Sequence, residues 1–336
     1  MTNAQPSSFR PLYPELNPYS TDVINREVLS HGVAHQIYIE QCGNPAGIPV
    51  IFLHGGPGSA CRPQHRRYFD PAVYRIILFD QRGCGRSRPL GELENNTIQH
   101  LTEDMEVIRQ QLAIQQWVIF GGSWGSTLGL YYAQQYPEQV LAMVLRGIFL
   151  ARQQDIDWVY TQDGAAQLFP DIWQRLIQHL EPAERTAPTQ SFMTALLSHD
   201  KQQQSKIAYA LYDWQCMIGR LAPVESQSTL DEDQLIAHFQ IQLHFALQQC
   251  FIEQHAILDN IDTLHSIPAW LIQGRYDLVC PVKQSLELHQ VWPDSQLNLI
   301  HLAGHAGDEP AVIDALINAT NTVAQRLSNL VGDDPA

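Results

Sequence analysis

The sequence predicts an α/β fold, with a mostly parallel, twisted sheet flanked by helices and an all-helical cap inserted into it. Short apolar runs, which suit strands buried on both faces of a parallel sheet, alternate with helical patterns up to about residue 150 and again after residue 265. Between these limits the pattern is helical and contains no convincing strand. We therefore expect a first part of the core at 1–150, a helical cap at 151–265 and a second part of the core at 266–336.

The first elements predict an antiparallel start to the sheet. Residues 1–20 are expected to form an arm without regular structure. Val23–Leu29 and His35–Gln41 alternate in polarity around a short Ser-His-Gly turn, which predicts a hairpin. A fully apolar strand, Pro49–Leu53, follows the hairpin.

Strands and helices then alternate along the chain. Further strands are predicted at Tyr74–Phe79, Trp117–Phe120 and Val140–Arg146, and helices at Leu101–Leu112 and Leu128–Tyr136. The helix from Leu101 places Glu103 and Asp104 in its first turn, where the helix dipole favours negative charge. An antiparallel start followed by alternating strands and helices predicts a doubly wound sheet.

The cap is predicted to consist of amphipathic helices. They are expected at Ile172–Leu180, Phe192–Leu197, Lys206–Ile218 and Leu235–Gln249. A helical block after the sixth strand is expected to lie over the carboxyl edge of the sheet, where open α/β sheets bind ligands. The core then resumes with a strand at Pro268–Gln273, a helix at Val282–Val291, a strand at Gln296–Leu302, a helix at Pro310–Leu327 and a tail at Gly332–Ala336.

Composition narrows the range of partners. The 336 residues carry a net charge of −15 and contain no Lys/Arg cluster, which argues against nucleic acid as a partner. The six cysteines are scattered without metal-ligand spacing, as expected of free thiols in a reducing compartment. The chain begins without a signal-peptide pattern, and no apolar run reaches the roughly 18 residues that span a bilayer. We expect a cytoplasmic protein with no membrane segment and no metal; the oligomeric state stays open.

One turn carries a candidate nucleophile. An apolar strand runs directly into Gly121-Gly122-Ser123-Trp124-Gly125, and a helical pattern follows. A serine at the apex of so sharp a turn is held at strained backbone angles, so its neighbours must be small. The strain exposes the hydroxyl at a helix N-terminus, where the dipole favours developing negative charge. Alone, this pattern also fits a Gly-rich turn that contains an incidental serine.

Two other Gly-rich loops follow buried strands. The first, His54-Gly55-Gly56-Pro57-Gly58, comes after the third strand, the position from which α/β hydrolases supply an oxyanion donor. We expect the backbone N–H groups of Gly56 and Trp124 to form an oxyanion hole, and Gly55 to line the substrate site. The second loop, from Asp80 to Ser87, lacks the Gly-Lys-Ser/Thr ending of a phosphate-binding loop, so Asp80 and Arg82 are expected to brace the structure.

Asp277 and His305 complete a candidate catalytic set with Ser123. Each follows a predicted strand in the second part of the core, and the chain order Ser, Asp, His is that of α/β hydrolases. Ser123 needs a base to remove its proton. His305 would be that base and then the acid for the leaving group, and Asp277 would fix the imidazole tautomer.

Rival residues are less well placed. His54 precedes the oxyanion loop and is expected to order it, whereas His301 lies inside a predicted strand. His244 belongs to a predicted cap helix. Among rival acids, Asp80 precedes the serine, which is the wrong order, and Asp308 stays open.

At these motifs the chain resembles the prolyl aminopeptidase (proline iminopeptidase) family of α/β hydrolases, which remove N-terminal proline from peptides. The resemblance rests on His54-Gly55-Gly56-Pro57-Gly58, the loop from Asp80 to Ser87, Asn95-Asn96-Thr97, Gly121-Gly122-Ser123-Trp124-Gly125-Ser126 and Gly274-Arg275-Tyr276-Asp277. It covers roughly residues 20–150 and 265–310. It implies an α/β-hydrolase fold with a helical cap, and a reaction that needs no metal or cofactor.

The cap departs from the family's pattern. In the family, a Trp-Glu-Gly and an Ile-Glu-Asn-His segment supply two carboxylates that bind the charged terminus of the substrate. The matching stretches here read Asp213-Trp214-Gln215-Cys216 and Gln240-Ile241-Gln242-Leu243-His244. The resemblance thus implies that Trp214, Gln215 and Gln242 contact the substrate, with neutral amides that hold an ammonium group more weakly than carboxylates do. Glu225, Asp213 or Glu253 are alternative sources of a carboxylate.

Three functions fit these residues. The first is a serine hydrolase that releases N-terminal proline from small peptides through an acyl-enzyme on Ser123. The second is a hydrolase of neutral amides or esters on the same core, because the amine-binding carboxylates are replaced. The third is a non-catalytic binding protein, which the complete Ser123, Asp277 and His305 set disfavours.

Overall fold

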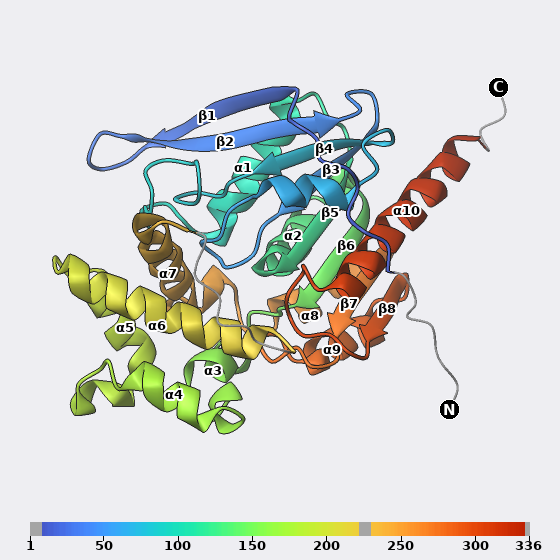
Figure 1. The fold of residues 1–336 in the computed structure, drawn as a ribbon. Helices are drawn as coiled ribbons and strands as arrows, with labels where there is room; N and C mark the ends of the chain where they lie inside the picture. The colour runs from blue at the N-terminus through green and yellow to red at the C-terminus, as the bar shows by residue number, and fades with distance from the viewer. Residues whose placement is uncertain (1–8, 222–229, 333–336) are drawn as a thin grey trace, which may run out of the picture.

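A single sheet runs through the centre of the molecule, and its strands lie where the sequence predicts them. The computed structural model describes residues 9–221 and 230–332. The strands within these residues are β1 (Ser20–Val28), β2 (Ala34–Gly43), β3 (Ile48–Leu53), β4 (Tyr74–Phe79), β5 (Trp117–Ser123), β6 (Val140–Ile148), β7 (Ala269–Gly274) and β8 (Ser295–Ile300). Their order across the sheet is β1-β2-β4-β3-β5-β6-β7-β8 (Figure 1).

The sheet combines an antiparallel edge with a parallel body. β1 pairs with β2, and β2 with β4, in antiparallel fashion, whereas every pairing from β4 across to β8 is parallel. Strand β3 lies between β4 and β5, so the loop after β3 and the turn after β5 come from neighbouring strands. Parallel neighbours end at the same edge, which brings both Gly-rich segments together.

Helices cover both faces of this sheet, which explains the fully apolar strands. The core helices are α1 (Ile98–Gln111), α2 (Trp124–Gln135), α9 (Val282–Val291) and α10 (Pro310–Gly332). Successive residues of β3 separate into two apolar clusters: Ile51 packs with residues of α1 and α2, and Phe52 packs with residues of α10. Side chains alternate across a strand, so a strand covered on both faces needs apolar residues at every position. The predicted doubly wound α/β fold is confirmed.

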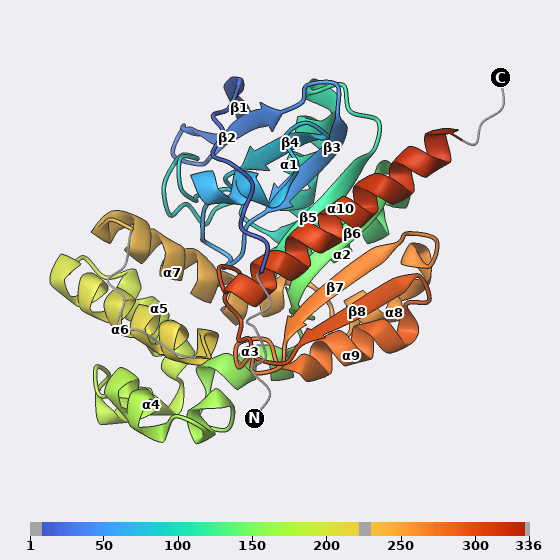
Figure 2. The same ribbon diagram turned by 45° about the vertical axis from the view of Figure 1, so that its right-hand side comes forward.

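The helices between β6 and β7 gather on one side of the molecule. We call α3 (Gln153–Tyr160), α4 (Pro170–Ile177), α5 (Pro188–Leu196), α6 (Lys201–Gly219) and α7 (Glu232–Leu247) the helical insertion. Helices α4 to α7 pack against one another and stand apart from the sheet (Figures 1 and 2), whereas α3 lies next to the core, where Trp158 Nε1 donates to the Leu278 carbonyl at 2.8 Å. The short helix α8 (Ala256–Asp259) instead returns to the core, where Gln134 Nε2 on α2 donates to the Ile257 carbonyl at 2.7 Å. Within the described residues the insertion contains no strand, as the sequence predicts.

Several boundaries differ from the sequence predictions because polar caps start the helices earlier. Thr97 caps α1 by accepting from the His100 N–H, so α1 begins at Ile98 and Asp104 lies beyond its first turn. Asp200 caps α6 in the same way, and α6 begins at Lys201. Strand β8 ends at Ile300, so His301 lies just after the strand and not inside it.

The two chain ends are only partly described. Residues 9–19 of the predicted arm form neither helix nor strand, and residues 1–8 lie outside the described residues. Helix α10 extends to Gly332, so the predicted tail is reduced to residues 333–336, which also lie outside them. None of the helices in the described part of the chain is long and apolar enough to cross a membrane.

A buried ion network holds the loop after β4. The Arg82 side chain is fully buried and donates to both carboxylate oxygens of Asp104 on α1, at 2.7 and 2.8 Å. It also donates to Glu27 on β1 and to the Asn95 carbonyl, while Arg26 adds a second guanidinium on Asp104 at 2.6 Å. Asp80 likewise accepts from the Cys61 N–H at 2.8 Å. Arg82 and Asp80 therefore brace this loop, as the sequence predicts.

The network yields a stability prediction. Substituting Asp104→Ala leaves the buried Arg82 guanidinium without its main counter-charge, and removing one partner of a buried pair costs about 3–5 kcal/mol. Urea unfolding monitored by tryptophan fluorescence is expected to show this loss in the free energy of unfolding. Glu103→Ala, at an exposed position on the same helix, is the control and is expected to change stability by less than about 0.5 kcal/mol. Equal, small effects of the two substitutions would contradict the role given to Asp104.

Candidate active site

Ser123 sits at a strained strand-to-helix turn. It is the last residue of β5 and directly precedes α2, with φ 58° and ψ −125°. Few residues other than glycine adopt a positive φ, and such strain is concentrated at functional sites. The small neighbours are required by space: a Cβ at Gly121 would lie 2.3 Å from the Gly125 carbonyl oxygen, and one at Gly125 would lie 2.2 Å from the Leu53 carbonyl oxygen.

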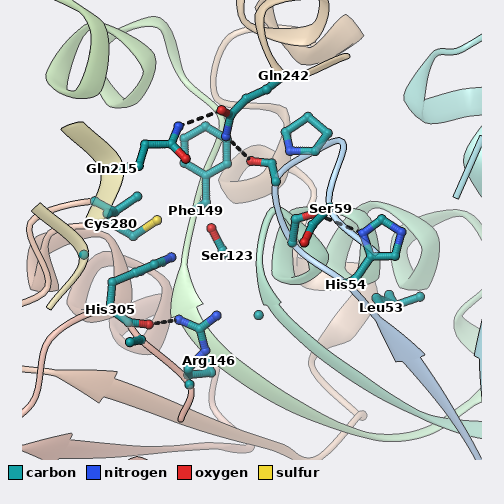
Figure 3. Close-up of a pocket in the computed structure, with 18 of the residues that line it drawn as sticks. Leu53, His54, Ser59, Ser123, Arg146, Phe149, Gln215, Gln242, Cys280 and His305 are labelled. Atoms are coloured by element: carbon teal, nitrogen blue, oxygen red, sulfur yellow. Dashed lines mark hydrogen bonds between the residues drawn. The ribbon is translucent and has the colours of Figure 1, made fainter. Parts of the chain in front are cut away.

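Asp277 and His305 meet in the same region. Asp277 follows β7 and His305 follows β8, and His305 Nδ1 lies 2.7 Å from Asp277 Oδ2. The other oxygen, Asp277 Oδ1, accepts from the Val279 and Cys280 N–H groups at 3.0 and 2.7 Å. Because the carboxylate accepts from Nδ1, the Nε2 atom of neutral His305 is left as an acceptor. Figure 3 shows Ser123 and His305 facing one cavity.

A buried amide that the sequence reasoning missed supports Asp277. Gln273 on β7 is fully buried, and its Nε2 donates to Asp277 Oδ2 at 3.2 Å and to the Cys280 carbonyl at 3.0 Å. Its Oε1 accepts from Ser285 Oγ at 2.5 Å and from the Ile148 N–H at 3.2 Å. The one signal in the sequence is a glutamine inside an otherwise apolar predicted strand.

The loop after β3 is held beside Ser123 by a second buried network. His54 Nε2 accepts from the Gln81 N–H at 3.0 Å, and its Nδ1 donates to the Gly55 carbonyl at 3.0 Å. Burial lowers the pKa of His54, so its imidazole stays neutral and can make both bonds. Gln81 Oε1 also accepts from the Trp124 indole at 2.9 Å, which ties this loop to the start of α2. His54 therefore orders the loop, as the sequence predicts.

Gly56 and Trp124 present backbone atoms and not side chains. Gly56 lines the cavity with φ 113°, an angle suited to glycine. The Trp124 ring is buried below the turn, while its N–H belongs to the first turn of α2, where helix N–H groups have no partner within the helix. Gly55 also lines the cavity, and a Cβ on it would lie 3.4 Å from Ser123 Cβ.

Gly55, Gly56, Ser123 and His305 line a cavity of about 410 Å³. Gln215 on α6 and Gln242 on α7 close it from the helical insertion, with Gln215 Nε2 donating to Gln242 Oε1 at 2.6 Å. Gln242 Nε2 donates in turn to the Gly56 carbonyl at 2.9 Å. The two amides are thus connected to each other and to the loop after β3 (Figure 3). The volume of the cavity suits a ligand of the size of a short peptide.

Trp214, which the resemblance places against the substrate, is not among the residues that line this cavity. Successive helix residues are turned by about 100°, so Trp214 and Gln215 cannot face the same way. The Trp214 indole is fully buried within the insertion, where it donates to the Val159 carbonyl at 3.0 Å and packs edge-on against Trp173.

The rival residues have other partners or positions. His244 Nε2 lies 3.2 Å from the Asn96 carbonyl, and His301 is exposed beyond the end of β8. Asp308 lines the cavity but pairs with Arg220 at 2.8 Å. Among the alternative carboxylates, Asp213 and Glu253 are absent from the described cavity lining, and Glu225 lies outside the described residues. The described residues contain no group of three or more side chains placed to hold a metal ion.

The support from Gln273 gives a kinetic prediction. Gln273→Met removes the second donor on Asp277 Oδ2 with little change in volume. It is expected to slow phosphonylation of Ser123 by a fluorophosphonate about tenfold, because His305 is held less firmly. Gln284→Met is the control: Gln284 is an equally buried amide that accepts from the Leu150 N–H at 2.8 Å, away from Asp277. The rate of phosphonylation is measured by mass spectrometry over time. If it falls equally in both variants, Gln273 has only a structural role.

Comparison with known proteins agrees with this arrangement. Residues 48–307 match the family model described as the alpha/beta hydrolase fold. Among solved structures, a proline iminopeptidase from Mycobacterium smegmatis superposes with a TM-score of 0.56 at 17% identity, covering 91% of this chain and 100% of that chain. The acetyl esterase MekB superposes with a TM-score of 0.65 at 14% identity, covering 91% and 97%. At such identities the structural likeness concerns the fold alone.

Sequence relatives are much closer and cover nearly the whole chain. A probable proline iminopeptidase from Leptolyngbya boryana is 42% identical over 323 residues, which are 95% of this chain and 99% of the relative. The proline iminopeptidase of Xylella fastidiosa strain 9a5c is 42% identical, with 93% of this chain and 99% of the relative covered. That of Arabidopsis thaliana is 40% identical, with 92% and 81% covered. The chain therefore belongs to the proline iminopeptidase family of α/β hydrolases.

Proposed function

We propose that this protein hydrolyses the peptide bond after an N-terminal proline in small peptides, using Ser123 as the nucleophile. The observation that carries the proposal is the 2.7 Å contact between Asp277 and His305 at a cavity that also contains the strained Ser123 turn. Family membership supports the prolyl substrate and favours it over the neutral amides and esters of the second interpretation.

The proposed reaction follows from the positions of these groups. Ser123 Oγ attacks the carbonyl carbon of the proline residue while His305 Nε2 takes its proton. The N–H groups of Gly56 and Trp124 bind the oxyanion, and each such donor is worth roughly 3–4 kcal/mol. The C–N bond then breaks as His305 returns the proton to the leaving amine. Water attacks the prolyl-enzyme ester with His305 again as base, which releases proline and restores the Ser123 hydroxyl.

The proposed site for the substrate's amino terminus lies under the helical insertion. Gln215 uses its Nε2 to donate to Gln242, so its carbonyl oxygen Oε1 is the acceptor that it offers a ligand. Phe149, Tyr160 and Phe245 line the cavity and supply apolar surface for a proline ring. The amino terminus is thus held by neutral acceptors, where the resemblance places carboxylates in the family.

The proposal extends to the helical insertion and to the compartment in which the protein works. The insertion, which the sequence places within 151–265, acts as a cap that encloses the substrate and sets specificity. We also propose that the protein works in the cytoplasm, because its cysteines are free thiols in the described residues, as expected in a reducing compartment.

Removing the nucleophile gives the first test. Ser123→Ala is expected to lower kcat for prolyl arylamide at least about 10⁴-fold, because a serine hydrolase without its nucleophile retains only binding and oxyanion stabilisation. The release of arylamine is followed by absorbance, and circular dichroism checks the fold. Ser205→Ala, on an exposed hydroxyl of α6, serves as the control and is expected to retain activity. Activity that survives in Ser123→Ala would show that another residue attacks the substrate.

The two glutamines give a second, asymmetric prediction. Gln215→Glu is expected to lower KM for prolyl arylamide about tenfold, because a carboxylate binds the substrate ammonium more strongly than an amide oxygen. Gln242→Glu is expected to lower kcat instead, because it removes the donor to the Gly56 carbonyl. Gln203→Glu, at the exposed start of α6, controls for the added charge. If all three variants behave alike in steady-state kinetics, Gln215 and Gln242 do not contact the substrate.

A further inference from the structure

Two guanidinium groups in the cavity have no role in the reaction as described. Arg62 and Arg146 both line it. Within residues 9–221 and 230–332, the one side-chain hydrogen bond of Arg146 runs from Nη1 to the His305 carbonyl. Among the residues that the structure describes, neither arginine pairs with a carboxylate.

The carboxylates that line the cavity are already neutralised by other arginines. Asp155 accepts from Arg152 through both oxygens, at 2.8 and 3.0 Å. Asp308 pairs with Arg220 at 2.8 Å. The charges of Arg62 and Arg146 therefore remain uncompensated by the described lining, in a protein whose net charge is −15. A cavity more positive than the rest of the molecule favours a ligand group that carries negative charge.

Both guanidiniums act on one region, which we call the aromatic lobe: His65, Tyr68, Phe52 and Phe120. The rings of Phe52 and His65 stack with centroids 4.5 Å apart, and those of Tyr68 and Phe120 with centroids 5.5 Å apart. His65 Nδ1 accepts from the backbone N–H of Arg62 at 3.0 Å, so Arg62 adjoins the lobe. Burial, together with the charges of Arg62 and Arg146, lowers the pKa of His65 to about 3, so this imidazole stays neutral.

The aromatic lobe lies on the leaving-group side of the nucleophile. Tyr68 donates to the Gly307 carbonyl at 3.0 Å, and Arg146 donates to the His305 carbonyl, so the lobe abuts the loop that carries His305. Figure 3 shows Arg146 on one side of Ser123 and the Gln215–Gln242 pair on the other. With the amino terminus at the glutamines, the residue that receives the proton from His305 extends toward Arg146 and Arg62.

We infer that this lobe is a subsite for a carboxylate on the leaving residue, held by Arg62 and Arg146, with apolar or aromatic side chains preferred at that residue. The α-carboxylate of a dipeptide stands one residue from the scissile bond, so Pro-Xaa dipeptides with a free carboxyl terminus are the favoured substrates. An acidic side chain on the leaving residue offers the same chemistry and is the second possible source. The inference rests on the proposed function.

The test compares four peptides that differ in carboxylates: Pro-Phe, Pro-Phe-NH₂, Pro-Glu-NH₂ and Pro-Gln-NH₂. The wild-type enzyme is expected to cleave Pro-Phe with a kcat/KM about tenfold above that of Pro-Phe-NH₂, the size expected from one charge-assisted hydrogen bond. Arg62→Gln is expected to bring this ratio close to one, and Arg62→Lys to restore part of it. Arg62 is exposed, so its replacement is compatible with folding. Arg175→Gln, on the exposed surface of α4, is the charge-matched control and should keep the wild-type ratio.

The outcomes separate the subsite from the proposed function. A preference for Pro-Glu-NH₂ over Pro-Gln-NH₂ that Arg62→Gln removes would support the subsite and assign the carboxylate to a side chain. Cleavage of all four peptides at similar rates, unchanged by Arg62→Gln, would overturn the subsite and leave the prolyl peptidase intact. Failure of the wild-type enzyme to cleave any of the four or prolyl arylamide would overturn the proposed function and this inference with it.

Discussion

Close packing of backbone around Ser123 is the constraint on which the rest of the site depends. The carbonyl of Leu53 at the end of β3 lies where a Cβ on Gly125 would stand 2.2 Å away, so β3 and the start of α2 touch through bare backbone. Only glycine at position 125 permits this approach, and only glycine at position 121 lets the end of β5 lie equally close to the start of α2. Between these contacts Ser123 has its positive φ, and the loop after β3 lies beside it. One packing contact thus sets the nucleophile and the neighbouring N–H donors in a fixed relation.

The helical insertion contributes to the geometry of the site as well as covering it. The Gly219 carbonyl at the end of α6 accepts from the N–H groups of both His305 and Ala306, each at 3.0 Å. From α7, Gln242 donates to the carbonyl of Gly56 on the opposite side of the cavity. The insertion therefore contacts the loop that carries the proposed base and the loop that carries a proposed oxyanion donor. Neither contact involves an apolar side chain, so the join is made by directional hydrogen bonds.

Much of the fold could be predicted because double-sided burial leaves a strong pattern: β3 is a continuous apolar run, and β4 and β7 are each interrupted by a single polar residue. The ends of such strands predict where the candidate residues lie. That rule selected Ser123, Asp277 and His305: Ser123 and His305 line one cavity, and Asp277 contacts His305 from behind it. It did not find Gln273, because a glutamine in an otherwise apolar strand indicates a buried amide without identifying Asp277 as its partner. The resemblance named Trp214 together with Gln215, because a motif identifies neighbours in sequence without stating which of them faces the cavity. Arg62 and Arg146 could not be identified from the sequence for a related reason. What distinguishes them is that neither is paired with a carboxylate in the cavity, and a sequence does not show which charged side chains are paired.

The two hydrogen-bonded joins of the insertion have a consequence for which polypeptides the enzyme can attack. A chain too long to be enclosed would have to hold the insertion away from the core. That displacement would withdraw the Gly219 carbonyl from His305 and the Gln242 amide from Gly56, so the machinery would be loosened at the moment an oversized chain arrived. Folded proteins and long nascent chains that begin with proline would then not be cleaved, because their binding would disrupt the catalytic geometry. The width of the entrance would be only a second barrier. Such an arrangement allows a peptidase to share a compartment with intact proteins without a separate inhibitor.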